Sequence, residues 1–188
     1  MPAAPPPELH GRAVTLRRYR LSDRDALGEA IAASHDHLRR WMPWAQAAPT
    51  EESVLAFLGP AVADFGARGA AEYAITLAES GRYVGGCGLM AQLGAGALEI
   101  GYWLDVRFLG RGLATEAAAL LTDTALSLDG IDRVEIHCDE ANVRSAGVPR
   151  RLGYRLDRID DDEVITPGEV GRSMIWVAAP PSATPSAR

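Results

Sequence analysis

The alternation of apolar and polar residues predicts a strand near the start of the chain and a helix after it. Residues 12–18 alternate the apolar Val14 and Leu16 with polar neighbours, the period-two pattern of a half-buried strand. Ser22 and Asp25 have the spacing of a capping box, with Ser22 as the N-cap, so we expect a helix to begin there.

A second helix is expected to begin near Thr50, after a break at residues 41–44. Four apolar residues recur on one of its sides at helical spacing: Leu55, Leu58, Val62 and Phe65. Pro60 lies within this stretch and should kink the helix or restart it, because proline removes a backbone hydrogen bond.

The rest of the chain is rich in short apolar runs. Strands are expected at residues 72–78, 83–90, 98–104, 133–138, 154–159 and 173–177, and helices after Gly112 and over residues 142–152. Short gaps between the runs favour antiparallel hairpins. The pattern predicts a single α+β domain over residues 9–178, with one mixed, mostly antiparallel sheet and helices on both faces. The segments 1–8 and 179–188, rich in Pro and Ala, are expected to be disordered tails.

Charge and composition narrow the class of protein. The net charge of −6 argues against a general affinity for nucleic acid, which requires a basic surface. All 19 basic residues are arginine, and the absence of lysine excludes Schiff-base chemistry and the phosphate-binding P-loop. No run approaches the roughly 20 apolar residues that cross a bilayer, and no secretory signal precedes the domain, so we expect a cytoplasmic protein without membrane contact.

The sulfur and imidazole groups predict neither a disulfide nor a metal site. Cys87 and Cys138 each lie in an apolar run, where buried free thiols are more common than a disulfide. His35, Asp36 and His37 are adjacent and would point apart on a helix, so no metal is expected.

The chemistry is concentrated in the turn from residue 107 to residue 114, between a predicted strand and a predicted helix. Free N–H groups at a helix start attract phosphate, and Gly110 and Gly112 remove side chains that would hold phosphate away from the backbone. Arg107 and Arg111 can add charge-assisted hydrogen bonds. The alternative is a tight strand-to-helix turn without a ligand.

Two signatures together resemble a known enzyme family. Arg107-x-x-Gly110-x-Gly112, after the strand ending at Leu104, resembles motif A of the Gcn5-related N-acetyltransferase (GNAT) superfamily. Asn142-Val143-Arg144-Ser145, followed by Arg151-Leu152-Gly153-Tyr154, is similar to a signature of the branch that acetylates ribosomal-protein N-termini. The order of the elements agrees with that family along nearly the whole chain.

The resemblance implies acetyl-CoA as a co-substrate and a sheet that splits beside the strand 98–104, so that pantetheine fits the gap like an added strand. It assigns cofactor contacts to twelve residues: Trp103, Leu104, Val106, Arg107, Leu109, Gly110, Arg111, Gly112, Leu113, Ala114, Asn142 and Arg151. The backbone of residues 103–106 would bind pantetheine and that of residues 109–114 the pyrophosphate.

The resemblance also implies direct attack of an amine on the thioester. Ser145 is then the candidate for protonating the CoA thiolate, and its alternative role is a helix N-cap. Glu163 is the preferred general base, Glu99 is its rival, and water is the third option.

Trp41 and Trp44 flank a proline in the segment that covers the substrate side in this superfamily, so we expect them to bind the acceptor. The leading hypothesis is acetylation of a protein or peptide α-amine. The alternatives are acetylation of a small amine, such as a polyamine, amino acid or aminoglycoside, and a catalytically idle acyl-CoA-binding module. The sequence leaves the oligomeric state open, with a homodimer as one option.

Overall fold

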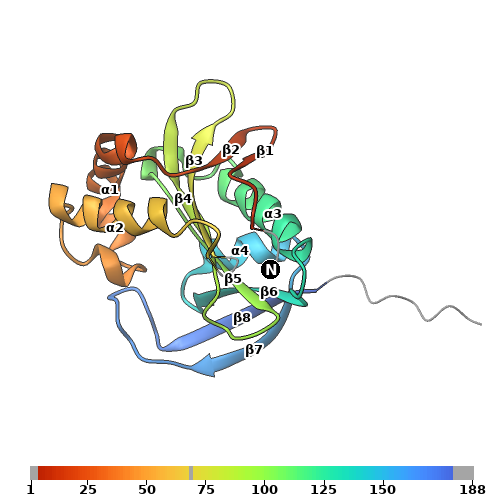
Figure 1. Ribbon diagram of the computed structural model, residues 1–188. Coiled ribbons are helices and arrows are strands. Elements are labelled where there is room, and N and C mark those ends of the chain that lie inside the picture. Colours follow the sequence, from red (N-terminus) through yellow and green to blue (C-terminus); the bar gives the residue numbers. More distant parts are fainter. Residues whose placement is uncertain (1–3, 68–69, 180–188) are drawn as a thin grey trace, which may run out of the picture.

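The computed structural model describes residues 4–67 and 70–179, which form one eight-stranded sheet in the order β1-β2-β3-β4-β5-β6-β8-β7 (Figure 1). Every neighbouring pair is antiparallel except β5 with β6, which confirms the mixed, mostly antiparallel sheet. The strands are β1 (Glu8–His10), β2 (Val14–Arg18), β3 (Ala71–Leu77), β4 (Tyr83–Met90), β5 (Ala97–Leu104), β6 (Arg133–Asp139), β7 (Arg155–Asp161) and β8 (Arg172–Ala178).

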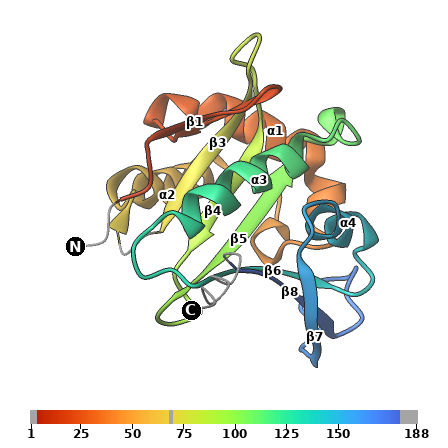
Figure 2. The same ribbon diagram turned by 90° about the vertical axis from the view of Figure 1, so that its right-hand side faces the viewer.

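Helices cover both faces of the sheet, as the sequence predicts (Figure 2). On one face, α1 (Arg24–Leu38) packs on β4 and α2 (Glu51–Ala63) packs on β3. On the other face, α3 (Leu113–Leu126) crosses β2, β4 and β5, and α4 (Val143–Arg151) lies against β6. None of the described helices is both long and apolar enough to span a bilayer.

The larger of two apolar clusters lies between the sheet and α3. It contains Ala117, Leu121 and Ala125 of α3, all with no exposed surface, together with strand residues such as Ile75 and Val134. Burying such side chains contributes about 1.5–3 kcal/mol each. The smaller cluster lies under α1 and α2 and includes Leu27 and Leu58.

The parallel pair β5–β6 is much shorter than its two strands. Its register runs only from Ala97↔Arg133 to Glu99↔Glu135. Beyond that point β5 stays paired with β4 through Leu104, and β6 stays paired with β8 through Asp139. The sheet therefore splits beside β5, as the family resemblance implies.

The expected N-terminal tail is shorter than predicted. Within residues 4–8, the Pro6 carbonyl accepts a hydrogen bond from the Tyr73 hydroxyl at 2.7 Å, and the Pro7 carbonyl accepts one from the Arg18 amide at 2.8 Å. Glu8 begins β1, which the sequence did not predict. Proline lacks a backbone donor but keeps its acceptor, so a proline-rich segment can still bind a sheet. Residues 1–3 and 180–188, the rest of the expected tails, lie outside the described residues.

The predicted capping box of Ser22 and Asp25 is wrong. A 3₁₀ turn, η1 (Leu21–Asp23), precedes α1, which begins at Arg24. The Asp23 carboxylate accepts a hydrogen bond from the Arg20 amide at 2.8 Å and forms a two-pronged ion pair with Arg17. Because the buried Asp23 carboxylate accepts the hydrogen bond from the Arg20 amide, the hydroxyl of Ser22 is not needed as a cap.

The buried side of α2 also differs from the prediction. Val54, Leu58 and Ala61 face the core, whereas Leu55 is 40% exposed. The helix runs unbroken through Pro60, so proline does not restart it, and Thr50 caps its first turn. Some apolar residues of α2, such as Leu55, therefore remain exposed to solvent.

Asp139 fixes the end of β6, where the sheet has split. Its carboxylate accepts hydrogen bonds from the amides of Ala141, Val170, Gly171 and Arg172 at 2.8–3.3 Å. Burial opposes ionisation, but these backbone donors outweigh it and lower the pKa of Asp139. One side chain thus ties the start of α4 to the start of β8.

We expect Asp139→Ala to lower the free energy of unfolding by about 2 kcal/mol, because it leaves several backbone N–H groups without an acceptor. Chemical denaturation measures this loss. Asp161→Ala is the matched control, because its carboxylate is 95% exposed and lies 3.5 Å from Arg172. Equal effects of the two substitutions would contradict the role given to Asp139.

Candidate active site

The turn before α3 presents a group of free backbone donors. Gly110 and Gly112 adopt φ values of 76° and 77°, which side chains disfavour, and an added Cβ at either would meet open space. Among the described residues, no oxygen accepts from the amides of residues 110–115; the first bond of the helix is Glu116 N to Gly112 O. Unpaired N–H groups together with the helix dipole form a site for phosphate.

Buried charge holds this turn in place. Asp105 has a fully buried side chain, and its carboxylate binds the Arg107 guanidinium at 2.6–3.0 Å and the Arg107 amide at 2.9 Å. Burial opposes ionisation of Asp105, but Arg107 outweighs it and lowers the pKa of that carboxyl. Glu29 of α1 binds the same guanidinium at 2.8 Å.

Two of the predicted cofactor contacts are therefore used within the protein. The Arg107 side chain is committed to Asp105 and Glu29 rather than directed at a phosphate. The Val106 amide donates to the Ser34 hydroxyl at 2.9 Å, so it is not free for pantetheine.

Other cations lie beside the turn. The guanidinium groups of Arg111 and Arg82 both stack on the Phe108 ring, at 5.0 and 4.9 Å from its centre. Sequence reasoning selected Arg111 but missed Arg82, which reaches the turn from the β3–β4 hairpin. Arg151 of α4 donates to the Thr115 hydroxyl at 3.2 Å, next to the first turn of α3.

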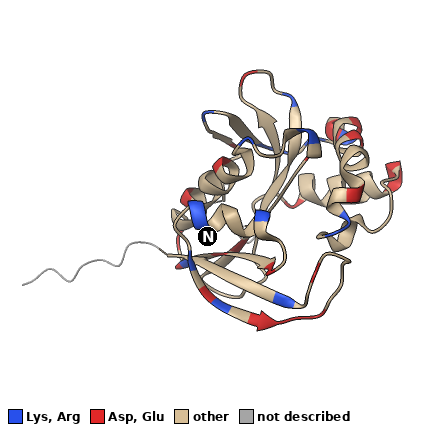
Figure 3. Ribbon diagram, turned by 180° about the vertical axis from the view of Figure 1, so that it is seen from behind, with Lys and Arg blue, Asp and Glu red and all other residues tan. Residues whose placement is uncertain are grey.

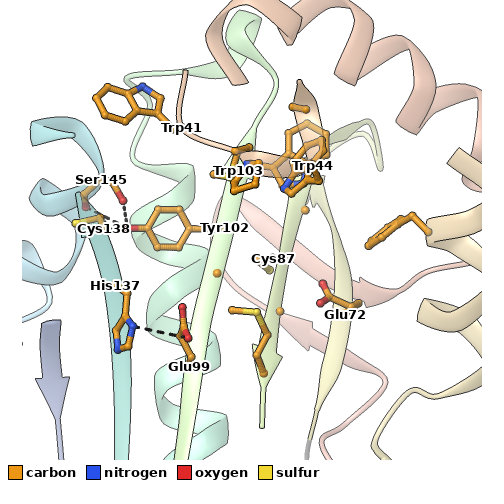
Figure 4. A pocket seen from close by; sticks show the side chains of 18 of the residues that line it. Trp41, Trp44, Glu72, Cys87, Glu99, Tyr102, Trp103, His137, Cys138 and Ser145 are labelled. Atoms are coloured by element: carbon orange, nitrogen blue, oxygen red, sulfur yellow. Dashed lines mark hydrogen bonds and ion pairs between the residues drawn. The ribbon is translucent and has the colours of Figure 1, made fainter. Parts of the chain in front are cut away.

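The Tyr102 side chain lies between β5 and α4, where the strands have parted (Figure 4). Its hydroxyl lies 3.1 Å from the Ser145 hydroxyl and 3.1 Å from the Ser145 carbonyl oxygen. Asn142, not Ser145, is the N-cap of α4, since its Oδ1 accepts from the Ser145 amide at 3.2 Å. The Ser145 hydroxyl is thus not used as a cap.

The hydroxyls and thiols in this region are neutral at ordinary pH. Burial raises the pKa of Tyr102, although its contact with Ser145 opposes the rise. Burial raises the pKa of the Cys138 thiol to about 11, and it also raises the pKa of Cys87. Both cysteines are free, as expected, with Cys87 buried and Cys138 partly buried. Neither is a ready nucleophile.

A cavity of about 830 Å³ opens on the α1–α2 face of the sheet, beside the split. Trp41, Trp44, Glu99, Ser145 and Glu163 all line it, so the predicted acceptor and catalytic residues share one space. Trp103 lines it as well, and its ring stands against that of Trp44 with centres 5.8 Å apart. Within the described part of the chain, no arginine lines this cavity.

Glu99 is the last β5 residue paired with β6, and a histidine lies beside it. His137 Nδ1 is 3.9 Å from Glu99 Oε2 (Figure 4), and its Nε2 is 2.7 Å from Glu135 Oε2. Gln92 donates to Glu99 at 2.7 Å. Sequence reasoning missed His137, because a histidine two residues after Glu135 in a strand forms no distinctive motif.

Glu163 lies on the opposite rim of the cavity, in the loop after β7, and is exposed. Figure 3 shows acidic positions at the end of β7 and on this loop. In the described ranges 4–67 and 70–179, no group of three or more His, Cys, Asp or Glu side chains could hold a metal ion.

Comparison with known proteins identifies the family. The model of the Acetyltransferase (GNAT) domain family matches residues 13–155, so the chain belongs to the GNAT acetyltransferases. The free donors of residues 110–115 suit a pyrophosphate group, such as that of acetyl-CoA.

Individual relatives are similar over most of their length. The Bacillus subtilis (strain 168) protein named "Putative ribosomal N-acetyltransferase YdaF" is 28% identical over 149 residues, 75% of this chain and 77% of its own. Two solved structures share the fold. RimL, a ribosomal L7/L12 alpha-N-protein acetyltransferase in complex with coenzyme A, has a TM-score of 0.79 at 22% identity, covering 94% of this chain and 98% of its own. The microcin C7 self-immunity acetyltransferase MccE, with acetyl-CoA and AMP, has a TM-score of 0.81 at 20% identity, covering 90% and 93%.

We expect Gly112→Ala to weaken CoA binding at least tenfold, about 1.4 kcal/mol, because the new methyl group strains the turn that presents the phosphate donors. Gly130→Ala is the matched control: Gly130 has φ 81° and equally open surroundings, but lies at the other end of α3. Calorimetry with CoA should show weakened binding only for Gly112→Ala. An unchanged dissociation constant in that variant would argue against the phosphate site.

Proposed function

We propose that this chain transfers the acetyl group of acetyl-CoA to the α-amine of a protein or peptide N-terminus, by direct attack on the thioester. The observation that supports the proposal is the cavity beside the split. It brings tryptophans, carboxylates and the Ser145 hydroxyl together, and none of its described lining residues is an arginine. Such a cavity favours a cationic amine over an anionic acceptor. Relatives named for acetylation of ribosomal proteins support the same substrate class.

The pantetheine arm belongs along the free edge of β5, with its phosphates on residues 110–115. Trp103 and Leu104 border this edge, and Asn142 and Ser145 face it from α4. The acetyl group would then lie toward the point where β5 rejoins β6. Glu99 and His137 lie at that point.

Removal of the amine proton is assigned to Glu99 rather than to Glu163. Glu99 is on the strand that borders the split, and its side chain is 13% exposed, so it can release to solvent the proton that it takes up; His137 lies 3.9 Å away. Glu163 is solvent-exposed on the rim, where it attracts a cationic acceptor. The preference drawn from sequence alone is therefore reversed in this proposal.

Return of a proton to the departing thiolate is assigned to Ser145. Its hydroxyl lies at the split, 3.1 Å from the Tyr102 hydroxyl. As Ser145 gives its proton to the thiolate, a proton from solvent can reach it through Tyr102, so that neither hydroxyl is left as an anion.

Short peptides with a free α-amine should be acetylated at least tenfold faster, in kcat/KM, than N-terminally blocked peptides containing lysine. Thiol release from acetyl-CoA measures this. Equal turnover of the blocked peptides would overturn the α-amine assignment, and turnover of small amines alone would favour a small-molecule acceptor. Absence of turnover with every amine would favour an idle acyl-CoA-binding module.

Ser145→Ala should lower kcat by roughly 10²–10⁴-fold if this hydroxyl delivers the proton. CoA affinity by calorimetry and the thermal midpoint should change little, since Asn142 caps the helix. Tyr102→Phe, which keeps the ring and removes only the hydroxyl, should have a smaller effect on kcat. A Ser145→Ala variant with full kcat would show that another group protonates the thiolate.

A further inference from the structure

The floor of the cavity contains a carboxylate that the proposed mechanism does not use. Glu72 of β3 is partly buried and lines the cavity near Tyr19 and Phe57. Within residues 4–67 and 70–179 its carboxylate has no hydrogen bond and no ion pair. Burial alone raises the pKa of Glu72 to about 7. A carboxylate held this way is costly unless a ligand compensates its charge.

Two glycines lie beside Glu72 on the neighbouring strands. Glu72 is opposite Gly88 of β4, and Gly88 is opposite Gly101 of β5. A Cβ on Gly88 would lie 2.5–2.9 Å from the Glu72 carboxyl atoms, so the carboxylate leans over β4 toward the split. Gly88 leaves room for the Glu72 carboxylate, whereas the Met90 side chain covers Gly101, where an added Cβ would lie 3.0 Å from Met90 Cε. Figure 4 shows Glu72 and Glu99 on the same side of the sheet.

The register separates Glu72 from the reacting centre. Gly88 and Glu99 are diagonal neighbours on adjacent strands, since Glu99 pairs with Met90, and such positions are about 7–8 Å apart. The Glu72 carboxyl group lies over Gly88 of β4, whereas Glu99 lies beside His137 of β6, on the other side of β5, so one amine nitrogen would not hydrogen-bond both carboxylates. Glu72 therefore suits a second group on the acceptor.

The surroundings favour a cation at this second position. The rings of Tyr19 and Phe57 meet edge to face, with centres 5.2 Å apart, and both line the cavity. Aromatic faces and a lone carboxylate both attract ammonium groups. The described lining includes no arginine that would compete for Glu72.

We propose that Glu72 binds a second cationic group of the acceptor, about 7 Å from the amine that is acetylated. The inference rests on amine acetylation as proposed above. A chain of five carbons between two nitrogens spans about 7.5 Å when extended. A free diamine of this length fits, and so does a peptide that begins with lysine.

The test compares acceptors that differ only in the second charge: 1,5-diaminopentane with pentylamine, and a peptide beginning with lysine with the same peptide beginning with norleucine. Wild-type protein should prefer the dication at least tenfold in kcat/KM, mainly through KM. In Glu72→Gln the ratio should fall to about one. 1,2-Diaminoethane is too short for its second nitrogen to reach Glu72, so the wild-type protein should not prefer it over ethylamine. Preference in only one of the two pairs identifies the source of the dication.

The proposal is overturned if wild type shows no preference in either pair, or if Glu72→Gln lowers turnover of monoamine and diamine equally. A thermal midpoint at or above that of wild type would show that Glu72→Gln folds.

A binding measurement keeps this inference separate from the proposed function. With CoA present, calorimetry of N-acetyl-1,5-diaminopentane against N-pentylacetamide requires no turnover. Wild type should bind the cationic compound at least tenfold more tightly, and Glu72→Gln should not. If no amine is acetylated but this difference persists, acetyl transfer fails and the cation site stands; equal binding of both compounds overturns the cation site.

Discussion

The early end of the β5–β6 pairing is the constraint on which the site depends. Only residues 97–99 of β5 pair with β6, although each strand continues beside its other neighbour. A β5 edge is thereby left without a partner strand inside the sheet, and backbone groups in such a place need partners. Tyr102 and the start of α4 border the split, and the cavity is lined by Tyr102, Asn142 and Ser145 at this place. The site exists because the sheet is incomplete.

Buried charge and a short turn connect this split to the phosphate donors. Asp105 follows β5 directly and fixes Arg107 and the 3₁₀ turn η4 (Val106–Phe108), while Ser34 anchors the Val106 amide from α1. Two positive-φ glycines then turn the chain into α3 and leave its first amides unpaired. Arg107, the arginine of the family motif, thus stabilises the turn through its ion pairs, and the backbone N–H groups supply the anion site.

Much of the fold could be predicted from the sequence, because apolar spacing in the strands and in α3 reports burial directly. The split could be anticipated only from the resemblance, since no residue of β5 or β6 encodes where pairing ends. The contacts of Arg107 with Glu29 and of Val106 with Ser34 could not be predicted, because these partners are distant in the sequence. His137 and Tyr102 were missed for the same reason: each gains its meaning from a side chain on another element. The proline-rich start was misjudged because composition does not reveal acceptor carbonyls.

Hydrogen exchange tests most directly whether the split in the sheet is the place where CoA lies. Exchange of the backbone amides in residues 100–104 and 110–115 should slow when CoA is added, while pyrophosphate alone should slow only residues 110–115. Protection of residues 110–115 by CoA with no change in residues 100–104 would contradict the account, because the pantetheine arm would then lie outside the split.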